Sequence, residues 1–154
     1  MEKEMRMHSE GSRSENAWIS LILRVAAASL FGVAAIGKFQ GSLDQVVINF
    51  QNTFKNTWLP INLVTLHARL VPYIEAILPV WLLTGWRLKW AWILAAFFTV
   101  SLAFGMMVAQ QSGVAASNYF YVLLCCAGLH FSQFDHFKIG RCCKNNSHEQ
   151  AGRR

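Results

Sequence analysis

Apolar residues dominate four separate stretches of this chain, and polar residues gather between these stretches and at both ends. The apolar stretches cover residues 17–37, 61–83, 90–110 and 117–134. Each approaches or exceeds the roughly 20 residues that an α-helix needs to cross the hydrocarbon core of a bilayer. The pattern therefore predicts an all-α membrane protein, in which residues 17–137 form one bundle of four transmembrane helices.

The connection between the first two predicted spans has a different pattern. Within residues 40–60, apolar side chains recur at helical spacing and polar side chains take the opposite face; the apolar positions are Leu43, Val46, Val47, Phe50 and Phe54. This pattern predicts an amphipathic helix that lies in the outer interface of the membrane. A surface loop with a few buried aromatic residues is the alternative. Residues 1–16 and 138–154 show no core-forming pattern, so we expect a disordered N-terminus and a basic cytoplasmic tail.

The composition agrees with a membrane protein, because 54% of the residues are hydrophobic and only 14% are charged. Soluble domains carry about 25% charged residues. The net charge of +6 comes from Lys and Arg that flank the predicted spans, which is typical of cytoplasmic segments and gives no reason to expect a nucleic-acid partner. These cations precede the first span, separate the second from the third and follow the fourth, whereas residues 111–117 carry no charge. We therefore expect both termini in the cytoplasm.

A carboxylate, Glu75, lies near the middle of the second predicted span. Placing a charge at that depth costs at least ~2.5 kcal/mol, so such residues usually face the protein interior and mark function. At 1.5 Å per residue, Arg24 on the first span lies ~10 Å from the cytoplasmic edge and Glu75 ~13 Å from it. Antiparallel neighbours at one level can pair, and His130 on the fourth span is shallower but within reach. Arg24, Glu75 and His130 are thus a candidate intramembrane site.

Two prolines, Pro72 and Pro79, flank this carboxylate. Proline lacks an N–H, so the carbonyls of Ala68 and Glu75 lose their usual helical donors. We expect the helix to bend around Glu75 and to offer free carbonyls there, as the broken helices that line membrane cavities do. The arrangement is either a functional site or a buried ion pair that only fixes the packing register.

A second polar group lies towards the predicted outer face. Its members are Lys38, His67, Arg69, Asn118, Tyr119 and Tyr121. The cations among them can attract an anionic substrate or a quinone carbonyl. The alternative is that long cationic side chains extend to lipid head groups and that tyrosines anchor the interface, as they commonly do.

The sequence contains no complete catalytic or metal-binding motif: HExxH, P-loop, nucleophile elbow and paired carboxylates are all missing. His67 and His130 fall towards opposite faces of the membrane, so they do not bracket one haem. The cysteines occur as the adjacent pairs 125–126 and 142–143, and neither pair is a CxxC redox motif. We therefore name no catalytic or metal-binding residue and do not expect a stand-alone enzyme, and the role of Cys142 and Cys143 stays open.

Small residues at four-residue spacing occur in two of the predicted spans. Ala28 and Gly32 form one such step, and Ser101, Gly105 and Ala109 form two successive steps. Small residues at this spacing let helix backbones approach closely in lipid. The contact is either within the bundle or between copies of the chain in a homo-oligomer.

Several residues together resemble the DoxX-like family of small four-helix membrane proteins. In the first span these are Arg24, Phe31, Gly37 and Lys38, and later positions that fit the same pattern are Pro72, Glu75, Gly85, Arg87 and Asp135. The segment TWLP at residues 57–60, followed by PYIE at 72–75, resembles the DoxX and MauE-related branch. The resemblance covers about residues 20–137.

This resemblance implies a multi-pass protein of a bacterial or archaeal cytoplasmic membrane that takes part in redox work. Characterised relatives include a subunit of a thiosulfate:quinone oxidoreductase and a maturation factor for methylamine dehydrogenase. We therefore expect a membrane subunit or anchor of a redox complex, with other subunits as partners and a quinone pocket near Glu75, Arg24 and the outer tyrosines. The alternatives are a small oligomeric transporter or proton-coupled carrier that uses Glu75, and a purely structural or assembly protein.

Overall fold

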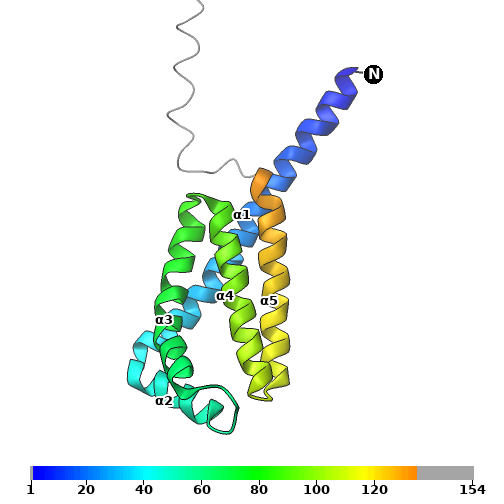
Figure 1. Cartoon of the computed structure of the whole chain (residues 1–154). Coiled ribbons are helices and arrows are strands. Elements are labelled where there is room, and N and C mark those ends of the chain that lie inside the picture. The colour runs from blue at the N-terminus through cyan, green and yellow to red at the C-terminus, as the bar shows by residue number, and fades with distance from the viewer. Residues whose placement is uncertain (1, 135–154) are drawn as a thin grey trace, which may run out of the picture.

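A computed structural model describes residues 2–134, with side chains described from residue 15 onwards, and this part of the chain consists of helices joined by short connections, with no strand (Figure 1). Its elements are α1 (Glu2–Gln40), α2 (Leu43–Phe54), α3 (Ile61–Thr84), α4 (Leu88–Val108), α5 (Ser112–Phe131) and a 3-10 turn, Ser132–Phe134. Four segments are long and apolar enough to cross a membrane: Glu15–Gln40, Ile61–Thr84, Leu88–Val108 and Ser112–Phe134. The predicted all-α fold with four membrane-spanning helices is confirmed, and its sidedness stays a prediction.

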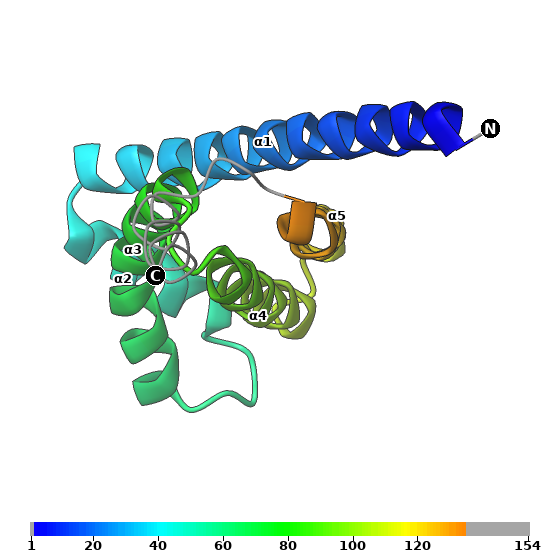
Figure 2. The same cartoon turned by 90° about the horizontal axis from the view of Figure 1, so that it is seen from above.

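The bundle consists of two helix pairs. α1 packs along α3, and α4 packs along α5. Figure 1 shows the α3–α4 turn and the end of α5 at one end of the bundle, and α2 with the α4–α5 turn at the other. We call these the turn end and the α2 end. In the view along the bundle, α4 lies between α3 and α5, while α1 runs along one side (Figure 2).

The first helix is longer than its apolar stretch. α1 begins at Glu2, so residues 2–16, which we expected to be disordered, are helical in the structure. Once the apolar part has formed a helix, each added residue gains a hydrogen bond without a new nucleation cost, and this segment is rich in the helix formers Glu, Lys, Arg and Met. The basic tail, Cys142, Cys143 and Asp135 lie outside the described residues.

The predicted helix between the first two spans is present as α2. It packs against the first half of α3, where the side-chain amide of Gln51 donates to the Thr65 hydroxyl at 2.9 Å. Phe54 is buried, and its ring stacks on that of Phe50 at a centroid distance of 6.2 Å. The end of the apolar face of α2 is thus buried against the bundle at Phe54, and the placement of α2 in the membrane interface stays a prediction.

The bundle core depends on one close approach between α4 and α5. Trp92 of α4 is fully buried, and a Cβ placed on Gly128 of α5 would lie only 2.4 Å from its indole ring. Only glycine leaves space for the indole at this position. Phe31 of α1 and Phe98 of α4 continue the core, with ring centroids 6.3 Å apart. Because interiors pack densely, this fit sets the spacing of the two helices.

α3 ends at a glycine in the left-handed region. Gly85 has φ 69°, and its N–H donates to the carbonyl of Trp81 at 3.2 Å. The indole N–H of Trp81 then donates to the carbonyl of Trp86 at 2.7 Å. Glycine adopts this conformation without the steric penalty of a Cβ, which is why it ends many helices. These bonds fix the turn that leads into α4.

Candidate functional site

The intramembrane carboxylate is paired across two helices. Glu75 of α3 is 4% exposed, and Lys38 near the end of α1 donates a hydrogen bond to it and forms an ion pair with it. The side chain of Lys38 is 26% exposed, so this pair has a buried acid and a partly accessible base. A charge-assisted hydrogen bond of this kind offsets the cost of burying the carboxylate.

Arg24 donates hydrogen bonds to the last carbonyls of α3. Its side chain is 3% exposed, its Nε donates to the carbonyl of Leu82 at 2.8 Å, and its Nη2 donates to that of Leu83 at 2.6 Å. The last carbonyls of a helix lack intrahelical donors and carry the negative end of the helix dipole, so a cation stabilises them. The approach needs a small neighbour, because a Cβ on Gly85 would lie 2.8 Å from Nη2.

The structure therefore gives Glu75 a different partner from the Arg24 that we expected. Helical side chains lean towards the N-terminus of their own helix. From α1, Lys38 leans towards the middle of the bundle, whereas Arg24 leans towards the turn end, where α3 finishes. His130 is exposed near the end of α5, where its ring meets that of Phe131 edge-on, and within the described residues no hydrogen bond or ion pair joins it to Glu75.

Both prolines lie inside α3, which continues through them from Ile61 to Thr84. Pro79 faces α1, since a Cβ on Gly32 would lie 3.9 Å from its ring. Pro72 is buried and lines a small cavity. Each proline removes the donor for the carbonyl four residues earlier, at Glu75 and at Ala68. A bend of α3 around Glu75 stays a prediction.

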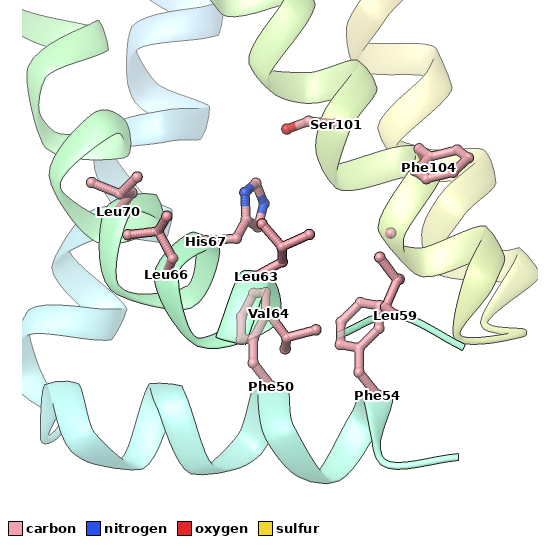
Figure 3. A pocket seen from close by; sticks show the side chains of 11 residues that line it. Phe50, Phe54, Leu59, Leu63, Val64, Leu66, His67, Leu70, Ser101 and Phe104 are labelled. Atoms are coloured by element: carbon pink, nitrogen blue, oxygen red, sulfur yellow. The ribbon is translucent and has the colours of Figure 1, made fainter. Parts of the chain in front are cut away.

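A cavity of ≈ 330 Å³ lies at the α2 end, between α2, α3 and α4 (Figure 3). We call it the large cavity, to distinguish it from a cavity of ≈ 230 Å³ beside Arg69. Its walls are mainly aromatic and aliphatic, with one histidine and one serine as the polar side chains. The lining residues are Phe50, Phe54, Leu59, Leu63, Val64, Leu66, His67, Leu70, Ser101, Phe104 and Gly105. Leu63, Leu66 and Phe104 are exposed on the outer surface of the bundle, so the cavity opens sideways.

His67 projects from α3 into this space, and Ser101 lies across it on α4 (Figure 3). The His67 ring is 6.5 Å from that of Phe50 on α2. Ser101 donates its hydroxyl proton to the carbonyl of Phe98 at 2.7 Å, which leaves the hydroxyl oxygen as an acceptor. The cavity thus offers an imidazole and a hydroxyl oxygen within apolar walls.

The structure divides the second polar group that we predicted. Lys38 pairs with Glu75, His67 lines the large cavity, and Arg69 lines a smaller cavity on another side of α3. The other three members, Asn118, Tyr119 and Tyr121, lie on α5 and line neither of these cavities. These two cavities therefore do not connect the tyrosines with Glu75.

Sequence reasoning missed the aromatic and α4 residues of the large cavity. The sequence pattern predicts an interfacial face for Phe50 and Phe54 and a close-packing step for Ser101 and Gly105. In the structure, α2 turns its phenylalanines towards α4, and a Cβ on Gly105 would lie 3.3 Å from the Phe54 ring. The small residues of α4 thus make room for α2 and for the cavity. In the sequence, the feature that indicated a close contact here was the four-residue spacing of the small residues of α4.

Comparison with known proteins identifies one family. The family model described as methylamine utilisation protein MauE matches residues 16–117, which is more than half of the chain. The match contains Lys38, Glu75 and every residue that lines the large cavity, and it ends before Tyr119 and His130. No curated protein and no solved structure matches the chain. The chain therefore belongs to the MauE family of membrane proteins.

Proposed function

We propose that this protein is a membrane subunit or anchor of a redox complex, and that the cavity between α2, α3 and α4 binds a lipid-soluble redox carrier of the quinone class. The name of its family links it to methylamine utilisation, which is redox-associated. The resemblance to DoxX-like proteins leads to the same expectation of a quinone-linked complex in a bacterial or archaeal cytoplasmic membrane. Protein subunits of that complex are the partners that this proposal requires.

The cavity is the observation that carries the proposal. Its volume, ≈ 330 Å³, lies in the lower part of the roughly 300–1,000 Å³ range of small-molecule sites. Apolar walls with a few placed polar groups are typical of such sites. The opening lies beside Leu63 and Leu66, which are exposed on the surface that would face lipid. A ligand dissolved in the bilayer can therefore enter without passing through water.

Two features of the walls suit a quinone ring. The imidazole of His67 has at least one N–H donor that can bond a quinone carbonyl. Phe50, Phe54 and Phe104 supply aromatic surface, which favours offset or edge contacts with another ring. His67 would bind and orient the ring, and the phenylalanines would exclude water from it.

Titration of the purified full chain with a short-chain ubiquinone tests this proposal, with quenching of tryptophan fluorescence as the signal. In the His67→Leu variant we expect about three- to tenfold weaker binding, because one hydrogen bond to the ring is lost. His130→Leu is the matched control, since His130 lies in the last turn of α5 and outside the cavity. Equal affinity of the wild type and His67→Leu would contradict the role of His67, and no saturable binding would contradict the site.

A second candidate function is favoured by the paired carboxylate. Glu75 is buried beside Lys38 and lies between two prolines of α3, an arrangement that a proton-coupled carrier can use. Four spans are few for a carrier, so this function requires a homo-oligomer. It predicts pH-dependent flux in vesicles that the Glu75→Gln variant abolishes. A purely structural role for the pair predicts instead that replacing both residues with apolar ones is tolerated.

A further inference from the structure

We propose that a second cavity, between the start of α2 and the middle of α3, binds a zwitterionic group that carries an ammonium and a phosphate or carboxylate. The cavity measures ≈ 230 Å³ and is distinct from the large one. Its lining residues are Leu43, Asp44, Val47, Ala68, Arg69, Pro72 and Tyr73. The proposal rests on this cavity alone, so it stands independently of quinone binding.

Two opposite charges face this cavity from different helices. Asp44 comes from the first turn of α2, and Arg69 comes from α3. In the described part of the chain, no ion pair joins them, and the ion pair of this region is the one between Lys38 and Glu75. Both charged side chains therefore keep their binding capacity for a ligand placed between them. Opposite charges on two walls fit a ligand with two charges better than a simple anion.

The backbone adds a further acceptor at the same wall. Ala68 lines the cavity, and its carbonyl has no helical donor because residue 72 is a proline. This carbonyl and the Asp44 carboxylate can both accept from an ammonium group, which has three donors. The planar guanidinium of Arg69 matches a phosphate or carboxylate in a bidentate manner. The cavity thus contains separate partners for each end of a zwitterion.

The surroundings favour the head group of phosphatidylethanolamine as the source of this zwitterion. Leu43 and Val47 form an apolar wall beside the charges, and Tyr73 is half-exposed, with its ring 5.9 Å from that of Phe39. The predicted interfacial position of α2 would place Asp44 at the depth of lipid head groups. Free zwitterions such as glycerophosphoethanolamine share the same chemistry, so the experiment must distinguish a lipid source from a soluble one.

Native mass spectrometry of the delipidated full chain, titrated with single phospholipids, tests the proposal. We expect phosphatidylethanolamine to bind at least about fivefold more tightly than phosphatidylcholine, because a quaternary ammonium cannot donate a hydrogen bond to Asp44 or Ala68. Phosphatidylglycerol, which lacks a cation, should also bind more weakly than phosphatidylethanolamine. Equal binding of the three lipids to the wild type would overturn the proposal, and this ranking does not depend on any variant.

Two substitutions separate the two ends of the ligand. Asp44→Asn should reduce the preference for phosphatidylethanolamine over phosphatidylcholine, because the charged acceptor is lost, whereas Arg69→Gln should weaken the binding of every phospholipid. Arg87→Gln and Glu15→Gln are the matched controls, since both residues lie outside this cavity. A preference that is undiminished by Asp44→Asn, in a chain with unchanged thermal stability, would overturn the proposal. Competition by glycerophosphoethanolamine would support a soluble source, and retained preference without such competition would support the lipid.

Discussion

Lys38 and Glu75 should be energetically coupled, because each is the ion-pair partner of the other across α1 and α3. Removing one member of a buried pair costs about 3–5 kcal/mol when the other charge stays buried. Lys38→Met leaves the carboxylate of Glu75 buried, at 4% exposed, but the lost partner was itself 26% exposed, so the free energy of unfolding should fall by a smaller amount, about 2–3 kcal/mol. Glu75→Met leaves a lysine that is already 26% exposed and can turn towards solvent. We therefore expect the free energy of unfolding to fall by only about 1 kcal/mol.

The double variant should lose less than the sum of the two single variants. With both charges replaced by apolar side chains of similar length, neither is left unpaired, and we expect a coupling free energy of about 2 kcal/mol. The assay is reversible unfolding of the full chain in mixed micelles, followed by far-UV circular dichroism. The control cycle combines Arg24→Met with Glu75→Met. These two residues have different partners, so their effects should add within about 0.5 kcal/mol. Additive effects for Lys38 and Glu75 would refute the reasoning.

Two glycines should tolerate alanine poorly, and a third provides the control. Gly128→Ala should lower the free energy of unfolding by at least about 1–3 kcal/mol, because its Cβ would lie 2.4 Å from the buried Trp92 ring. Gly37→Ala, in a helix and with nothing within 4 Å, should be neutral or stabilising by up to about 1 kcal/mol. Gly85→Ala should cost about 1–2 kcal/mol through its positive φ and must also displace Arg24. The melting temperatures of the three variants in one detergent test these expectations. Equal melting temperatures for Gly128→Ala and Gly37→Ala would contradict the packing argument.

The fold was predictable because the bilayer imposes a simple rule on the sequence. Only helices satisfy their own backbone groups in hydrocarbon, so apolar stretches of sufficient length identify the spans. The helix α2 was visible as well, since Phe50 and Phe54 recur at helical spacing with polar residues between them. The extension of α1 to Glu2 was not predicted, because polar residues there give no packing signal while intrinsic propensity still allows a helix.

The partners of the charged residues were harder to predict from depth alone. Counting residues places Cα atoms, but Lys38 and Arg24 have long side chains that lean along the helix by several residues' rise. The carbonyls at the end of α3, which lack helical donors, are alternative acceptors for Arg24. The prediction from depth did not take them into account. Identifying Glu75 as a polar centre needed only its position, whereas naming its partner needed the geometry of two helices.

The large cavity was not predictable from the sequence, because its walls come from three helices. His67 was singled out as a polar residue, but nothing in the sequence placed it opposite Ser101. The tyrosines of α5 line neither this cavity nor the smaller one, since a shared depth does not mean a shared side of the bundle.

The most direct test of the central claim is mass spectrometry of what co-purifies with the full chain after gentle extraction, read for proteins and lipid-soluble small molecules together. The account predicts an oxidoreductase partner and a bound quinone in stoichiometric amounts, with the quinone depleted in His67→Leu and retained in His130→Leu. A chain that purifies with neither partner nor quinone would contradict the account, and quinone retained equally in both variants would show that the cavity is not its site.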